Sequence, residues 1–215
     1  MTYAGPAAAD TPGTRIGGVP HTPSGFEWPR CRECAGPMQF LAQVSLADVE
    51  AGSAGLLSIF MCQNDPGLCE EWDATAGGNR AFAFGADAVQ IPIPPDDGIA
   101  LLDETCAVRF EQFDAESYLV AREGWHQQTG RPVQDVLGQV GGQPAWLQHD
   151  ETPSCSGCSR PMSFVVQFEE GHDHRTSANF GGGGCGRASD ADRAGLPRSS
   201  GSAERLDGRP GALVR

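Results

Sequence analysis

A short cysteine motif constrains this chain more than any other feature, because it occurs twice in the same surroundings. Cys31 and Cys34 form a Cys-x-x-Cys turn that leads into an apolar segment, and Cys155 and Cys158 do the same. Both turns continue as Pro-Met-x-Phe-x-x-Gln. One tight cysteine pair of this kind supplies half of the ligands of a structural zinc site. The sequence therefore predicts two related metal-binding elements.

The similarity extends beyond the cysteines. Residues 16–44 align with residues 140–168 without a gap, at an offset of 124 positions, and eleven of these 29 positions are identical. A repeat of this period is the size of a domain and not of a solenoid unit. We therefore expect an internal duplication.

The apolar pattern predicts a β-rich α+β fold. Strands are expected at the apolar or alternating runs of residues 38–46, 56–62, 81–84, 89–93 and 106–113. A helix is expected over residues 114–128, with Asp114 as its N-cap. The fold class is then two internally duplicated half-domains, each with a zinc-ribbon-like Cys-x-x-Cys element packed on antiparallel strands.

Composition divides the chain into five segments. They are a flexible N-terminal segment (1–15), a first β-rich repeat with a four-cysteine site (16–113), a linker with the helix (114–139), a truncated second repeat (140–186) and a tail (187–215). The tail has no aromatic residue and no cysteine. It lacks the strand and last ligand of the first repeat, so we expect a disordered or out-of-frame tail.

The first cysteine pair has a distant second pair. Cys31, Cys34, Cys62 and Cys69 together predict a closed tetrahedral zinc site, which would be structural because no coordination position is left for water or substrate. Four unligated thiols are the alternative. A redox dithiol is a further one, although the pattern lacks the helix N-terminus that lowers a thiol pKa.

The second cysteine cluster is predicted to be incomplete. Its candidate ligands are Cys155, Cys158 and Cys185, the last of which is one residue from the position equivalent to Cys62. The position equivalent to Cys69 is Arg193, which cannot bind zinc. Two histidines of an acidic loop are alternative ligands, namely His172 and His174.

No other motif predicts catalysis. Cys106 stands alone on an apolar run and is expected to be a buried thiol. A nucleophile–base pair of Cys106 and His126 is the alternative, with no third group to orient it. The glycines of residues 181–184 lack the Lys-Ser/Thr of a phosphate-binding loop.

Charge limits the class of partner. The formal net charge is -13, which argues against nucleic acid or an anionic membrane as the main partner. A basic protein is the expected partner, and the oligomeric state is not indicated. The chain shows neither a signal-peptide pattern nor an apolar run that would span a bilayer, so we expect a cytoplasmic protein with reduced thiols.

The motif combination resembles a known family. Ile/Val-Gly-Gly-x-Pro, followed by the cysteine motif, resembles the YwqG-like bacterial domain of unknown function over residues 15–186, and residues 140–148 and 179–186 strengthen the match. The chain is also similar to the programmed cell death protein 2 family, which is linked to chaperoning a ribosomal protein. The resemblance implies a β-rich, duplicated fold without an established reaction. Some members of the family lie near toxin genes, which implies an immunity role. The zinc follows from cysteine spacing alone.

These observations predict a non-catalytic, zinc-stabilised module that binds a basic protein client, in a chaperone-like or immunity-like role. One alternative is an enzyme of unrecognised type, which requires a concave pocket with perturbed ionisable groups outside the cysteine cluster. Another is a non-functional truncated relic, which would leave a sheet edge unpaired.

Overall fold

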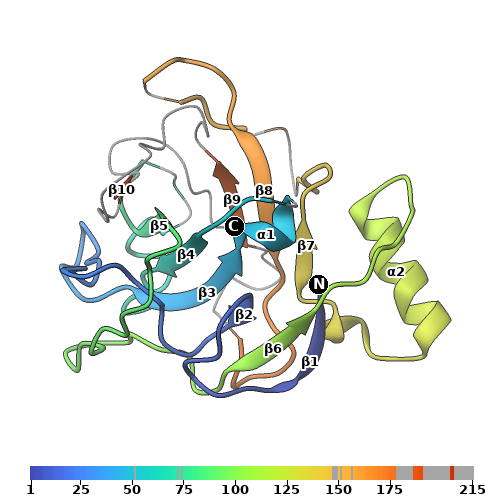
Figure 1. Cartoon of the computed structure of the whole chain (residues 1–215), viewed down its shortest axis with the longest axis horizontal. Coiled ribbons are helices and arrows are strands. Elements are labelled where there is room, and N and C mark those ends of the chain that lie inside the picture. The colour runs from blue at the N-terminus through green and yellow to red at the C-terminus, as the bar shows by residue number, and fades with distance from the viewer. Residues whose placement is uncertain are drawn as a thin grey trace.

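Figure 1 shows a β-rich body with one helix, α2, standing at its side. The computed structural model describes residues 1–50, 52–71, 73, 75–146, 150, 152–155, 157–177, 186–190 and 204–205. The larger sheet is antiparallel, in the order β1 (Thr2–Pro6), β6 (Cys106–Arg109), β2 (Arg15–Ile16), β3 (Gln39–Ser45), β4 (Leu56–Met61), β5 (Asn79–Phe84) and β10 (Glu204–Arg205). The smaller antiparallel sheet has the order β7 (Gly138–Val140), β8 (Ser163–Phe168) and β9 (Gly186–Asp190). The helices are α1 (Leu46–Val49), α2 (Tyr118–Thr129) and the 3-10 helix η1 (Val133–Asp135). The β-rich fold with few helices is therefore confirmed.

Strand β3 lies inside the larger sheet and is buried on both faces. Successive side chains of a strand point to opposite faces, so β3 contributes to two cores. On one face, Leu41 and Val44 join Ile59 of β4 in an apolar cluster that also contains Val166 and Phe168 of the smaller sheet. This shared cluster packs the two sheets against each other.

The other face of β3, β4 and β5 carries a cluster of aromatic side chains. The ring centroid of Phe60 lies 5.3 Å from that of Phe40 and 5.7 Å from that of Phe82. Trp28, from the loop before the first cysteine pair, packs edge-on against Phe60 at 5.5 Å. Burying one such ring stabilises the fold by about 1.5–3 kcal/mol. The aromatic cluster therefore holds the segment that leads into Cys31 against the sheet.

The two Cys-x-x-Cys turns have the same backbone hydrogen bonds. In each turn the amide of the first cysteine, Cys31 or Cys155, donates to the carbonyl oxygen at the turn's far end, at 2.9 and 2.8 Å. The residue after the second cysteine has a positive φ in both turns, 57° at Ala35 and 58° at Ser159. The geometry of the turn thus recurs at the offset of 124 positions found in the sequence.

The glutamine that ends each motif also has the same contact. Gln43 Oε1 accepts a hydrogen bond of 2.9 Å from the amide of His21, and Gln167 Oε1 accepts one of 3.0 Å from the amide of Ala145. The two donors are separated by the same offset as the two glutamines. These contacts join the Gly-Gly-x-Pro segment of each predicted repeat to the strand that follows its cysteines.

The glycine pairs of that segment satisfy a steric demand. Gly17 has a φ of 74° and Gly141 a φ of 62°, both in the left-handed region that other residues rarely adopt. At Gly17 a Cβ atom would also lie 2.4 Å from the carbonyl oxygen of Glu104. A side chain at this position would therefore push apart the turn and the segment that enters β6.

The predicted flexible segment at residues 1–15 instead contains a strand. β1 pairs antiparallel with β6, and Met1 and Thr2 are buried. Its sequence lacks apolar alternation because it lies at the edge of the sheet, where backbone hydrogen bonds hold it. The flexible assignment is corrected for this part of the chain.

The predicted strand at residues 89–93 is also corrected. Gln90 makes only an isolated bridge with Thr22. Pro92 has no backbone N–H, so it cannot extend the ladder beyond that bridge. The segment is extended and largely exposed, and Ile93 is 92% exposed.

The helix begins later than the sequence predicted. Ser117 and not Asp114 is the N-cap of α2, and its side chain accepts a hydrogen bond from the amide of Val120 at 3.4 Å. Because α2 starts there, the predicted linker divides into an extended segment, α2, η1 and the start of β7. Among the helices in the described part of the chain, the longest is α2 with 12 residues, and none is long and apolar enough to cross a membrane.

Strand β10 and all of β9 except its first residue, Gly186, fall within the predicted tail. β9 pairs with β8, and β10 pairs with β5. β8 therefore has a neighbour on each side, β7 and β9, where the relic hypothesis expected an unpaired edge. The other residues after Ser177 lie outside the described part of the chain, so the disordered or out-of-frame tail stays a prediction.

Candidate metal centre

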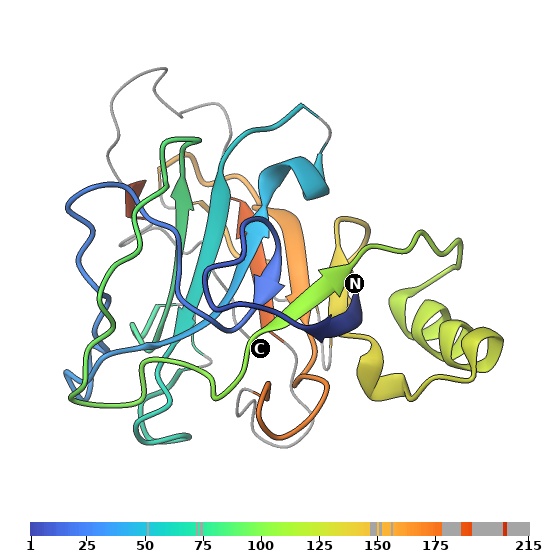
Figure 2. The ribbon, with the colours of Figure 1, turned by 60° about the horizontal axis from the view of Figure 1, so that its bottom comes forward.

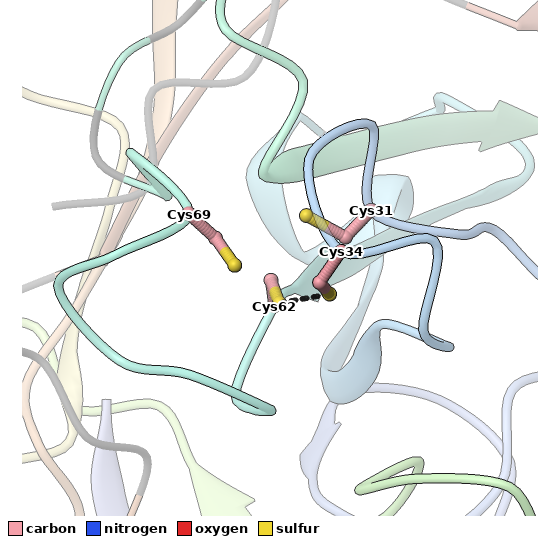
Figure 3. A group of neighbouring side chains, drawn as sticks. All are labelled: Cys31, Cys34, Cys62 and Cys69. Atoms are coloured by element: carbon pink, nitrogen blue, oxygen red, sulfur yellow. Dashed lines mark hydrogen bonds between the residues drawn. The ribbon is translucent and has the colours of Figure 1, made fainter.

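Four cysteines converge at one end of the aromatic cluster. Figure 3 shows Cys31 and Cys34 on the loop before β3, facing Cys62 and Cys69. Cys62 directly follows β4, and Cys69 lies on the loop after it. The four sulfur atoms all lie within 4.8 Å of one another, and those of Cys34 and Cys62 are 3.7 Å apart. The cysteines predicted from spacing are therefore the ones that the fold brings together.

The first pair is positioned by a tight turn. The amide of Ala35 donates to the carbonyl oxygen of Cys31 at 3.0 Å, which closes the turn and directs both thiols to one side. The next residue is Gly36, where a Cβ atom would lie 2.7 Å from the side-chain nitrogen of Asn64. The turn thus packs directly against the loop that carries the second pair.

The second pair is held by the end of β4 and by a closed loop. The amide of Cys62 donates to the carbonyl oxygen of Gly78 at 2.7 Å. The loop that holds Cys69 is closed by Glu71, whose carboxylate accepts from the amide of Gly67 at 2.6 Å. Glu71 is 1% exposed. The residues between Cys62 and Cys69 therefore form a folded loop that brings the two thiols together.

Asn64 connects the two halves of the site. Its side-chain nitrogen lies 2.9 Å from the carbonyl oxygen of Pro37, and it donates to the sulfurs of Cys62 and Cys34 at 3.4 and 3.7 Å. Its side-chain oxygen accepts from the amide of Ile99 at 3.1 Å. In the sequence Asn64 begins Asn-Asp-Pro-Gly, which is typical of a turn and does not by itself indicate this role. A polar side chain two positions after a metal-ligand cysteine was the signal that could have found this role.

The thiols differ in their acidity. Burial raises the pKa of Cys31, against hydrogen bonds from the backbone of Cys34 and Glu33. Burial and then the neighbouring thiols raise the pKa of Cys69 far above its usual range. Burial also opposes ionisation of Cys34, but a backbone hydrogen bond from Gly36 and its sulfur neighbours hold its pKa below the usual value. Four thiolates at these distances would repel one another, so full ionisation requires a bound cation.

The arrangement fits a tetrahedral metal ion. Zn–S bonds of about 2.3 Å place the four sulfurs of such a site roughly 3.8 Å apart. The separation of Cys34 and Cys62 already has this value, and the other pairs need shifts of about 1 Å or less to reach it. Zinc and iron both accept four thiolates in this geometry. With four protein ligands the site would be closed to substrate.

The geometry does not favour the redox alternative. Cys31 and Cys34 lie in a turn, and the next helix along the chain, α1, begins only at Leu46. The first cysteine pair therefore lacks the N-terminal helix dipole that lowers the thiol pKa in dithiol oxidoreductases.

The second cysteine pair has no comparable cluster in the described part of the chain. Cys155 is buried and Cys158 is exposed, with Arg160 Nε donating to Cys158 Sγ at 3.5 Å. Cys185 lies outside the described residues, as do the glycines at 181–184. His172 has other partners, because its Nδ1 lies 2.5 Å from Asp135 and its ring stacks on Tyr3. The incomplete second site stays a prediction.

The remaining candidates do not form a nucleophile–base pair. Cys106 is fully buried, as predicted, and burial raises its pKa to about 12. His126 lies in the last turn of α2, where its Nδ1 is 2.6 Å from the carbonyl oxygen of Arg131.

Comparison with known proteins places the metal centre within a family. The model of a family described as "Domain of unknown function (DUF1963)" matches residues 14–135, which is more than half of the chain. The matched region contains all four clustered cysteines and α2, and it ends before the second cysteine pair. No curated protein matches this chain.

Proposed function

We propose that this protein, which belongs to the DUF1963 family, is a zinc-stabilised, non-catalytic module that binds a basic protein client. One observation carries the proposal: four cysteine sulfurs lie within 4.8 Å of one another, enough to complete the coordination of one ion. Such a site stabilises the fold and leaves no position for a reacting molecule. Binding then depends on the surface that the metal centre holds in place.

Zinc is the metal that we propose for this centre. Tetrahedral sites of four thiolates hold zinc or iron, and zinc has no redox chemistry to damage neighbouring thiols. We propose a cytoplasmic location, where thiols stay reduced and bind metal.

We also infer that the chain arose by internal duplication. The matching turns and the matching glutamine contacts recur at one offset, which supports a common origin of the two halves. The finer resemblance to the YwqG-like and programmed cell death protein 2 families supports a chaperone-like or immunity-like role for the proposed client binding.

A metal count on the purified full chain tests the zinc centre. We expect one zinc ion per chain by elemental analysis. Iron, seen by its visible thiolate absorption, would replace zinc in the proposal, and the absence of any metal would overturn it. Two zinc ions would mean that the second cysteine pair is completed.

A pull-down tests the client. The acidic chain, with its formal net charge of -13, is expected to retain basic proteins and to release them as the salt concentration rises. Recovery of acidic proteins alone, or retention that is insensitive to salt, would contradict the proposed client class.

A further inference from the structure

A cavity of about 440 Å³ lies beside α2, away from the metal centre. Its walls come from α2, from the extended segment at residues 110–117 and from the segment at residues 138–143. Figure 2 shows α2 standing beside the sheets and joined to β6 by that extended segment. The volume is within the range of sites that bind small groups, about 300–1,000 Å³.

Aromatic side chains form much of the wall. Tyr118 and Trp125, on α2, are 8% and 4% exposed and belong to one buried cluster. Phe110 and Phe113 also line the cavity and are 39% and 37% exposed. Aromatic rings left at the surface around a cavity are typical of a binding site.

Two carboxylates line the same cavity. Glu111 accepts hydrogen bonds from the hydroxyl of Thr2 at 2.7 Å and from the indole of Trp125 at 3.0 Å. The Thr2 bond lowers the pKa of Glu111 against the effect of burial, and the Trp125 bond adds to it. Glu116 lies at the exposed start of α2. Glu111 thus remains ionised at neutral pH; its hydrogen-bond partners are neutral donors, and the charges of Arg109 and Arg131 lower its pKa further.

The basic groups near the cavity are of two kinds. The side chain of Arg122 lines the cavity, and its guanidinium lies 3.7 Å from the carboxylate of Glu169. The N-terminal amine of Met1 also lies there, and burial lowers its pKa to about 6, so it is largely neutral at pH 7. Arg131 is outside the lining, with its guanidinium 5.0 Å from the ring centroid of Trp125. The lining therefore presents aromatic side chains and two carboxylates against one arginine that is already paired.

We propose that this cavity binds an arginine or lysine side chain from a basic segment of the client. The inference rests on the proposed function, because it assigns a surface to the same client. Phe110 and Phe113 would contact the cation through their ring faces, and Glu111 and Glu116 would supply opposite charge. The stem of the basic side chain would pack on the aromatic wall.

Binding of a defined peptide to the full, metal-loaded chain tests this assignment. The probe is a fluorescein-labelled peptide of alternating arginine and glycine, and binding is followed by fluorescence anisotropy. Glu116→Gln removes a rim charge, and Phe113→Leu keeps apolar bulk without the aromatic face. Each is expected to weaken binding about twofold to fivefold. Asp87→Asn removes the same charge from an exposed position outside the cavity and is expected to leave binding unchanged.

The outcomes separate the cavity from the client class. If the peptide binds and both cavity variants match the parent, the cavity assignment is overturned while the basic client stands. If the arginine peptide does not bind, both proposals fail. If a peptide of alternating glutamate and glycine binds better, the cavity is an anion site around Arg122 and the assignment is wrong. Circular dichroism and a metal count on each variant exclude unfolding as the cause of weaker binding.

Discussion

Replacing Asn64 by alanine tests how the metal centre is held together. The side chain bridges the two cysteine-bearing loops, with bonds of 2.9 Å to Pro37 and 3.1 Å from Ile99. It also donates to the sulfurs of Cys62 and Cys34. Asn64→Ala removes all four contacts while every proposed ligand remains.

The size of the effect follows from those contacts. Each neutral hydrogen bond contributes about 1 kcal/mol net, so loss of the two backbone bonds lowers the free energy of unfolding by about 2 kcal/mol. Residues that support metal ligands typically contribute about 10- to 100-fold to metal affinity. That range corresponds to about 1.4–2.8 kcal/mol of metal-binding free energy. We expect the zinc dissociation constant of Asn64→Ala to rise by this factor.

The assay combines affinity with a spectroscopic signal. Zinc affinity is measured by competition with a chromogenic chelator, and the thiolate-to-metal charge-transfer band is recorded on the cobalt(II) form. Gln167→Ala is the matched control, because Gln167 is also an amide side chain, is buried in the smaller sheet, and accepts a hydrogen bond from the amide of Ala145 outside the metal centre. Only Asn64→Ala is expected to shift the band. An unchanged zinc affinity, or a band identical to that of Gln167→Ala, would refute the assigned role.

Two further predictions, the first with a control substitution, test the fold around these sites. Cys31→Ser is expected to abolish metal binding, and with it the cooperative unfolding transition of the aromatic core in near-ultraviolet circular dichroism, because binding and folding are coupled at such centres. The control Cys155→Ser is expected to retain both the metal and the transition. Equal loss in the two variants would contradict this prediction. Glu111→Gln replaces a carboxylate that accepts from Thr2 and Trp125, and it is expected to lower the unfolding free energy by about 1 kcal/mol at neutral pH. Because the folded pKa of Glu111 is lowered, its contribution is present above the ordinary glutamate pKa of 4.5 and is lost as the pH falls through the folded value. Denaturant titrations of parent and variant should therefore converge in acid, and a constant difference across pH would count against this contribution.

The central strands were predictable because their own side chains specify them. β3, β4 and β5 have apolar residues on one or both faces, and each was expected within two residues of its observed bounds. Strand β1 was not predicted, because an edge strand can form through backbone pairing alone, without an apolar pattern in its sequence. The run at 89–93 has the β-branched residues of a strand, but Pro92 prevents it from joining a ladder.

The same division applies to the metal centre. Which four cysteines meet was predictable from one tight pair and a second pair after an apolar strand. For Asn64 the sequence offered only its position two residues after Cys62, because its contacts with Pro37 and Ile99 arise only when the loops fold back over one another. The cavity beside α2 depends in the same way on Ser117 starting the helix later than the composition indicated.

The strand registers bear on the second cysteine pair, whose site the sequence predicted to be incomplete. In the first repeat Met61 pairs with Gln39, so the next residue along the chain, Cys62, returns beside the turn that precedes β3. In the second repeat Asp190 pairs with Ser163, the position equivalent to Gln39. The residue that follows Asp190 is Ala191, which has no ligand atom. Counting along the sequence pointed to Cys185, but Cys185 precedes β9 in the chain, whereas Cys62 follows β4. Strand pairing is a better guide to equivalent positions than the sequence offset, because an insertion between two strands changes the offset but leaves the hydrogen-bonded ladder intact. One metal ion per chain is therefore the count that the registers favour.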